Sequence, residues 1–249
     1  MIIEELIQET MSSAQMEVNR YTYPIFIADI NGKPDLIASS TAIKVEGRSY
    51  LVTASHVLLE VLRVDSPFLV GINTKYVPIK TDFIYTSNKR SDNFDIAFTE
   101  LSDDFVKEHS VAVFKEEDLN IDKNFSSSHI AFIHGFPNSR NKQKKALYQT
   151  KAFRVKGYAY GGVLKKESVD WNKFDKNEAL HTCITYGKTS NQQIPVHPRG
   201  ISGGGLWIVP NIQMLNQIYL DSVFIEYFQR DKLAFATKIH EVVNLIKNA

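Results

Sequence analysis

The sequence predicts an all-β protein of two six-stranded antiparallel β-barrels, with one helix at each end of the chain. Three observations predict this fold. Short runs rich in β-branched and aromatic residues recur along most of the 249 residues, turn signals separate several of them, and a polar stretch near the middle leaves about six runs on either side. Closure into barrels is expected because it removes exposed sheet edges.

Both ends of the chain have amphipathic helical patterns. The pattern at the start predicts an N-terminal helical extension over residues 1–21, and residues 238–249 predict a C-terminal helix. The apolar residues at roughly helical spacing are Ile3, Leu6, Ile7, Met11 and Met16 in the first helix, and Ile239, Val242, Val243 and Ile246 in the second.

The first barrel is predicted over residues 22–115. Its strands are short, and Glu46-Gly47-Arg48 is one of the turn signals between them. The six runs that predict strands are 23–30, 36–45, 48–55, 68–73, 76–86 and 94–101.

A polar, helix-tolerant stretch over residues 103–125 then interrupts the strand pattern, and we expect a linker over 116–127. The second barrel, with the C-terminal helix, is predicted over residues 128–249. Its six runs are 128–137, 151–164, 179–187, 204–209, 218–228 and 232–239. A site built by both halves would lie in the cleft between them.

Composition narrows the classes of function. Hydrophobic residues make up 43% and charged residues 23% of the chain, as in ordinary globular proteins. Lys and Arg number 29 against 28 Asp and Glu, so a net charge of +1 favours neither nucleic acid nor an anionic membrane as partner. No cofactor and no bound metal is expected.

Cysteine use and hydropathy indicate the compartment. Cys183 is the only cysteine, which excludes an intrachain disulfide, and its alternating surroundings predict a buried strand residue. The first residues are acidic where a secretion signal would be basic, and no apolar stretch is long enough to cross a bilayer. A reducing, cytoplasmic setting is the simplest expectation.

One serine is surrounded by glycines in the segment HPRGISGGGLW. Gly200 precedes Ser202, and three glycines follow it. A mobile surface loop tolerates such glycines, but the apolar run 206–209 comes next and is typical of a buried strand. A tight turn that leads into a core strand can present a hydroxyl and bare N–H groups to a substrate, as acyl transfer requires. Ser202 is therefore a candidate nucleophile.

Two segments of the first half supply a base and a group to orient it. In SYLVTASHV an apolar strand leads to His56, whose imidazole could accept the serine proton. In SDNFDIAFTEL, Asp95 opens an apolar strand, where a partly buried carboxylate needs a donor such as an imidazole N–H. Asp92 is the competing carboxylate, but its place in the preceding turn favours Asp95.

Together these segments resemble the trypsin-like serine proteases of the chymotrypsin fold. VTASHV is similar to their TAAHC or TAAHV segment, FDIAF to D-I-A-L, and GISGGGL to G-D-S-G-G-P-L, in the family's order of His, Asp and Ser. HGFP and FATKIHEVVNLIK are weaker similarities, to the start of the second barrel and to the last strand with its helix. The resemblance covers residues 22–248.

The resemblance implies a serine endopeptidase that acts on peptides or proteins through an acyl-enzyme. Ser202 would be the nucleophile, His56 the general base and then acid, and Asp95 the group that orients His56. The backbone N–H groups of Gly200 and Ser202 would form the oxyanion hole.

The sequence departs from the family pattern in two places, and the first concerns activation. Secreted members carry Asp just before the serine, where it captures the ammonium that zymogen cleavage frees, whereas this chain has Ile201. Activity is therefore expected not to depend on a new N-terminus, and the N-terminal helix or a regulatory protein could gate the site. The usual Gly-x-Gly-Phe before the first catalytic strand is replaced by Ser39-Ser40-Thr41-Ala42.

The sequence leaves alternatives open for the substrate specificity and for the function. The resemblance places Val196 and His197 in the primary substrate pocket and Glu226 on its flanking strand; His197 favours a polar or acidic side chain and Glu226 argues the other way. The main alternative to a protease is a catalytically silent trypsin-like domain that binds peptides or proteins. Hydrolysis of esters by the same triad, and nucleic-acid binding through the basic segment NSRNKQKK, are further alternatives.

Overall fold

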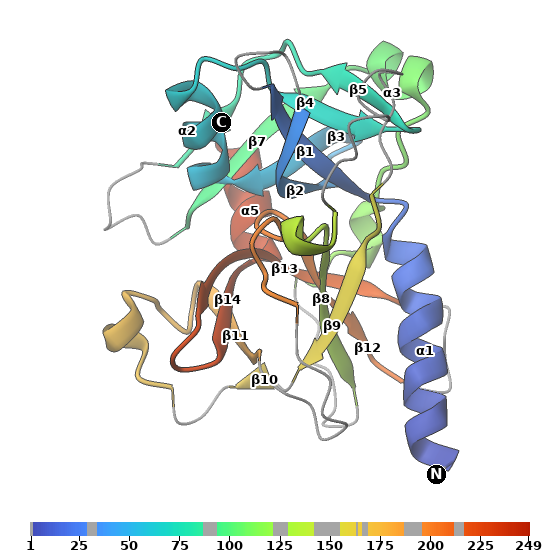
Figure 1. Ribbon diagram of the computed structural model, residues 1–249, viewed down its shortest axis with the longest axis vertical. Coiled ribbons are helices and arrows are strands. Elements are labelled where there is room, and N and C mark those ends of the chain that lie inside the picture. Colours follow the sequence, from blue (N-terminus) through green and yellow to red (C-terminus); the bar gives the residue numbers. More distant parts are fainter. Residues whose placement is uncertain are drawn as a thin grey trace.

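The computed structural model describes most of the chain in two antiparallel β-sheets (Figure 1). The first sheet occupies the upper part of the view and the second the lower part. The described residues are 2–28, 34–86, 94–121, 129–141, 155–162, 164–165, 169–186, 196–211 and 217–249. The prediction of a mostly β architecture in two antiparallel parts with a helix at each end is confirmed.

The first sheet pairs its seven strands in the order β5-β4-β1-β2-β3-β7-β6. Two-residue turns join β4 to β5 and β2 to β3, and Gly47 has a positive φ of 77° in the turn between β2 and β3. The strands are β1 (Thr22–Ala28), β2 (Pro34–Val45), β3 (Arg48–Ala54), β4 (Leu69–Ile72), β5 (Lys75–Pro78), β6 (Ile84–Tyr85) and β7 (Ile96–Leu101).

The second sheet has the order β10-β11-β14-β13-β12-β8-β9. Its strands are β8 (Ile130–Gly135), β9 (Tyr158–Gly162), β10 (Leu164–Lys165), β11 (His181–Thr185), β12 (Gly205–Val209), β13 (Tyr219–Phe228) and β14 (Leu233–Lys238). Cys183 lies buried in β11, as predicted.

Each sheet has seven strands where six were expected, for the same reason in both halves. The run 76–86 is divided into β5 and β6, which pair with different strands, and the run 151–164 contributes β9 and the start of β10. A continuous apolar run in the sequence does not show where the chain stops pairing with one strand and begins to pair with another. Among the described residues no ladder joins the two ends of either order, so each sheet keeps two edge strands.

The N-terminal helix α1 (Ile2–Val18) is confirmed, and its buried side includes part of the expected apolar face, since Met11 packs against the core. Thr10, Ala14 and Val18, four residues apart, are buried, whereas Met16 is 71% exposed. The helix packs against β8 and β9, and the Gln15 amide donates to the carbonyl of Gly157 at 3.0 Å. The small side chains of Thr10 and Ala14 on this side let the helix approach the sheet closely.

The remaining helices include α2 (Ser55–Arg63), α3 (Asp103–His109) and α5 (Ile239–Lys247). Three 3₁₀ turns occur at Glu116–Asp118, Asn138–Arg140 and Trp171–Phe174. The apolar face predicted for the C-terminal helix is buried in α5, which packs on β13 and β14. None of the helices in the described part of the chain is long and apolar enough to span a bilayer.

The two halves share one hydrophobic core. Its largest cluster includes buried residues of both sheets, and Phe114 from the first half meets Trp207 of β12 edge-on, with ring centroids 4.9 Å apart. At the surface, the Lys247 ammonium of α5 lies 3.3 Å from the carboxylate of Glu46, in the turn between β2 and β3. The second half is therefore packed directly against the first.

Candidate active site

His56 lies where a buried strand gives way to a helix. β3 ends at Ala54, and His56 is the second residue of α2. The apolar face of α2, with Val57, Leu58 and Val61, is buried and holds the first turn in place. The His56 side chain is 51% exposed, so its ring is anchored at one end and open to a cleft at the other.

Asp95 binds His56 through both carboxylate oxygens. Oδ1 accepts the backbone N–H of His56 at 2.9 Å, and Oδ2 lies 2.7 Å from ring nitrogen Nδ1. A carboxylate can only accept, so Nδ1 carries the proton and Nε2 is left with its lone pair. The competing residue Asp92 lies outside the described residues.

The same carboxylate changes the basicity of the ring. Desolvation is the largest influence and lowers the pKa of His56, but the hydrogen bond and charge of Asp95, together with the charge of Glu226, outweigh it. The net result is a pKa above the ordinary value for histidine. His56 is thus a stronger base than a free imidazole.

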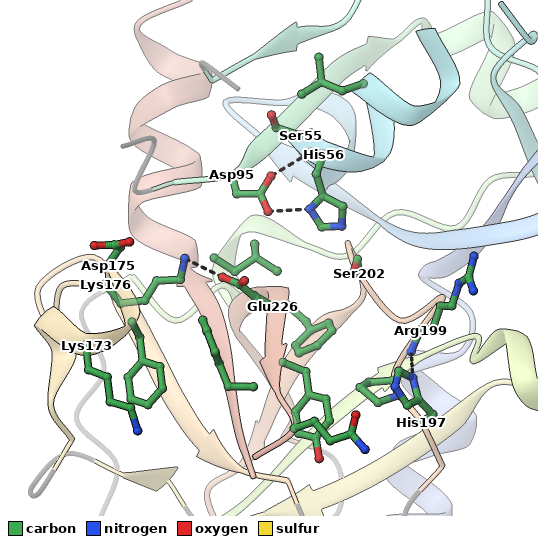
Figure 2. Close-up of a pocket in the computed structure, with 18 residues that line it drawn as sticks. Ser55, His56, Asp95, Lys173, Asp175, Lys176, His197, Arg199, Ser202 and Glu226 are labelled. Carbon is green, nitrogen blue, oxygen red and sulfur yellow. Dashed lines mark hydrogen bonds and ion pairs between the residues drawn. The ribbon is translucent and has the colours of Figure 1, made fainter. Parts of the chain in front are cut away.

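Ser202 lies across the imidazole from Asp95. Figure 2 shows the ring between the carboxylate on one side and Ser202 on the other. All three residues line one cleft, to which the first half contributes His56 and Asp95 and the second half Ser202. No hydrogen bond joins the Ser202 hydroxyl to His56 among the described residues; such contacts often tighten only when a substrate binds.

The peptide groups around Ser202 leave two N–H groups bare. The carbonyls of Arg199 and Ile201 accept from the N–H groups of Asn138 and Gly204, each at 2.8 Å. Because the N–H and C=O of one trans peptide point in opposite directions, these bonds turn the N–H groups of Gly200 and Ser202 the other way. Neither N–H donates to any acceptor among the described residues. Two adjacent bare donors beside a serine fit an oxyanion hole.

Two glycines of this turn have conformations that a side chain would strain. Gly200 has a φ of 96° and Gly203 a φ of 85°. A Cβ on Gly203 would come within 2.1 Å of the Ser39 carbonyl oxygen, so only glycine lets this turn rest on the first sheet.

The cleft that His56, Asp95 and Ser202 line has a volume of about 680 Å³. His197 and Glu226 line it, whereas the side chain of Val196 is buried and does not. Arg199 N–H donates to Nδ1 of His197 at 3.2 Å, which leaves Nε2 to carry the proton of the neutral ring (Figure 2). His197 can therefore donate to a ligand in the cleft.

Lys176 is a cleft residue that the sequence did not indicate. Its ammonium lies 3.0 Å from the carboxylate of Glu226, and its side chain is only 9% exposed (Figure 2). Glu226 is thus already paired with a cation of this chain, and a basic substrate side chain would compete with Lys176 for it. No signal in the sequence links residues 50 positions apart, and only the packing of the loop before β11 brings Lys176 here.

Ser39 is a second residue that was missed, although a signal existed. Ser39, Ser40 and Thr41 form a hydroxyl run inside β2 and all three are fully buried. Buried polar groups need partners, and a run of three within an apolar strand marks a place where the strand serves more than packing. Ile201, which stands directly before Ser202 where secreted members of the resembled family carry Asp, is also fully buried.

The described residues bring together no group of three or more His, Cys, Asp or Glu that could hold a metal ion. The second half of the basic segment NSRNKQKK, with Lys142, Lys144 and Lys145, lies outside the described residues.

Comparison with known proteins gives a match in structure alone. No family model and no curated protein sequence matches the chain. Among solved structures, the HtrA-type protease AlgW with a tripeptide superposes with a TM-score of 0.58 at 12% identity, over 96% of this chain and 62% of that one. A structure from work on the coupled folding and binding of the intrinsically disordered Sesbania mosaic virus VPg protein has a TM-score of 0.52 at 14% identity, over 91% of this chain and 95% of that one.

These values establish the fold and no more, and the chain spans less than two thirds of the length of the HtrA-type protease. The two sheets, the terminal helices and the superposition agree with one another: this protein has the chymotrypsin-like fold of the trypsin-like serine proteases.

Proposed function

We propose that this protein is an intracellular serine endopeptidase, with Ser202 as nucleophile, His56 as general base and Asp95 as the group that orients His56. The observation that carries the proposal is the position of His56, held by both oxygens of Asp95 and facing Ser202, next to two N–H groups that meet no acceptor in the described part of the chain. This arrangement supplies each part that acyl transfer needs.

The chemistry follows from these groups. His56 Nε2 takes the proton of the Ser202 hydroxyl as its oxygen attacks a peptide carbonyl, and the imidazolium is stabilised by Asp95. The N–H groups of Gly200 and Ser202 bind the oxyanion of the tetrahedral intermediate. His56 then gives its proton to the leaving amine, and water attacks the acyl-enzyme by the reverse route. The same triad can hydrolyse esters.

Activation is proposed not to require a new N-terminus. Ile201 fills the position before the nucleophile with a buried apolar side chain, so an ammonium group would find no carboxylate there. Gating by α1 or by a regulatory protein is part of the same proposal, and a peptide or protein is the proposed substrate.

A fluorophosphonate probe tests the proposal, because it reacts only with a serine that a base and an oxyanion hole activate. We expect one adduct per chain by intact mass, located on Ser202 by peptide mapping, and none with Ser202→Ala or His56→Ala. Cleavage within a mixed peptide library, read by mass spectrometry, separates an endopeptidase from an esterase. An unlabelled wild-type protein that nonetheless binds peptides would contradict the proposal and favour a catalytically silent binding domain.

A further inference from the structure

Ser39 connects the first sheet to the turn that carries Ser202. It lies in β2, it is fully buried, and its partners are about 160 positions away in the sequence. Its backbone N–H donates to the carbonyl of Ser202 at 2.9 Å, and its hydroxyl lies 2.8 Å from the carbonyl oxygen of Gly200. One residue therefore holds the carbonyls on both sides of the segment Ile201-Ser202.

The direction of the Ser39 hydroxyl is determined by a third partner. The backbone N–H of Phe136 donates to Ser39 Oγ at 2.9 Å. A backbone N–H can only donate, so the hydroxyl proton is free to point at Gly200. Ser39 is in turn held by Thr53, whose hydroxyl donates to the Ser39 carbonyl at 2.8 Å. All these groups are buried, where a hydrogen bond left unmade is costly.

These contacts hold the peptide groups that flank those that would bind the oxyanion. With its carbonyl held by Ser39, the Gly200–Ile201 peptide directs its N–H to the carbonyl of Pro198, at 2.8 Å. The turn is then closed on both sides of Gly200, and the bare N–H of Gly200 cannot rotate inward without breaking the hydrogen bond from the Asn138 N–H to the carbonyl of Arg199. Thr41, two residues further along β2, adds a hydroxyl to the carbonyl of Gly203 at 3.2 Å.

We propose that Ser39 is a positioning residue, which sets the oxyanion-hole geometry from the first sheet in place of the ion pair that Ile201 cannot make. The inference rests on the proposed function. It gives the unusual Ser39-Ser40-Thr41 run a role: the turn is held by hydroxyl groups of the folded chain and needs no cleaved terminus.

Ser39→Ala and Ser40→Ala form a matched pair for the test. Both serines are fully buried neighbours in β2, but the Ser40 hydroxyl donates to the Tyr23 carbonyl within the first sheet, at 3.1 Å. Two quantities are measured for each variant. One is the second-order rate constant of fluorophosphonate labelling as a function of pH, and the other is the number of adducts per chain when the reaction is complete. Loss of a whole oxyanion-hole donor costs about 10²–10³ in rate. For Ser39→Ala we expect a rate constant at least about tenfold lower at full stoichiometry and with an unchanged pH midpoint, and for Ser40→Ala a rate within about twofold of wild type.

Two results would overturn the inference when the wild type reacts. Equal rate constants in the two variants would remove any special role of Ser39. A lower stoichiometry with an unchanged rate constant in the reactive fraction would show that Ser39 only supports folding. If Ser39→Ala folds poorly, Ser39→Cys serves as a second variant. Its thiol retains a weak donor, so we expect a labelling rate constant between those of wild type and Ser39→Ala.

If the wild type does not react, the proposed function has failed, and amide hydrogen exchange decides the inference separately. We expect faster exchange over residues 198–205 in Ser39→Ala than in Ser40→Ala. Equal exchange in the two variants would show that Ser39 does not hold the turn.

Discussion

Asp95 illustrates how one residue can determine the state of another. Its φ of 50° lies in the left-handed region, which costs most residues about 1–2 kcal/mol but which Asp and Asn tolerate. In this conformation its carbonyl accepts the N–H of Ser55 at 3.0 Å, while its carboxylate meets the N–H and the ring of His56. The charge-assisted hydrogen bonds offset the conformational cost.

The raised pKa of His56 predicts the pH dependence of reactivity. The base must be neutral, so labelling should fall as pH drops through a midpoint above the ordinary value of about 6.5. In Asp95→Asn, which keeps the backbone preference, we expect a rate about 10³–10⁴ lower and a midpoint at lower pH, since desolvation then dominates. A pH profile of fluorophosphonate labelling checks both, and a midpoint unmoved by Asp95→Asn would contradict the assignment.

The interaction of His56 with Asp95 affects stability in the opposite direction from reactivity as the pH changes. Protonated His56 is stabilised by Asp95 only in the folded state, so this contribution is present below the unfolded-state pKa and is lost as pH rises through the higher folded-state pKa. Since the ring is half exposed, the contribution is small.

Gly203 and Gly47 allow the cost of a close contact to be separated from that of backbone strain. Both have positive φ, but a Cβ at Gly47 meets nothing within 4 Å, whereas at Gly203 it meets the first sheet. Gly47→Ala should cost about 1–2 kcal/mol of unfolding free energy. Gly203→Ala should add about 1–3 kcal/mol for overpacking. Denaturant unfolding measures both values, and equal costs would be inconsistent with the close approach of the turn to β2.

At the scale of elements, α5 shows a sequence pattern that decides its own packing. Helical spacing indicated the face carrying Ile239, Val242, Val243 and Ile246, and that face is buried against β13 and β14. A helix with one apolar stripe has a single favourable way to lie on a sheet. For α1 the same reasoning identified the helix and part of its buried side, including Met11, but it misplaced Met16, which is exposed.

Truncation in α5 is expected to measure this packing. Ile246→Ala should lower the free energy of unfolding by about 2–4 kcal/mol, because Ile246 is 4% exposed within the shared core. Asn244→Ala, on the exposed face of the same helix, should change it by less than about 0.5 kcal/mol. Thermal or urea unfolding compares the two variants, and similar losses would mean that α5 is not docked as described.

At the scale of the whole molecule, the cleft depends on contacts between the halves. His56 and Asp95 come from the first half and Ser202 from the second, and Ser39 joins them at the nucleophile turn. Next to Asp95, the Thr237 hydroxyl of β14 donates to the carbonyl of Phe94 at 2.5 Å. With a shared core and these hydrogen bonds, relative movement of the halves would disturb the proposed catalytic groups.

Sequence alone determined the features that depend on neighbours along the chain. Period-two apolar runs predicted two β-rich halves, helical spacing predicted both terminal helices, and three short motifs predicted His56, Asp95, Ser202 and the bare amides of the glycine turn. Local propensity and burial act over a few residues, so these features can be recognised without coordinates.

The tertiary structure decided what depends on groups far apart in sequence. It divided single runs between strands, buried Val196 away from the cleft, paired Lys176 with Glu226, and placed the Ser39 hydroxyl on the carbonyl of Gly200, 161 positions away. Hydrogen bonds and close packing require a precision of tenths of an ångström, and only the folded arrangement of both sheets supplies it.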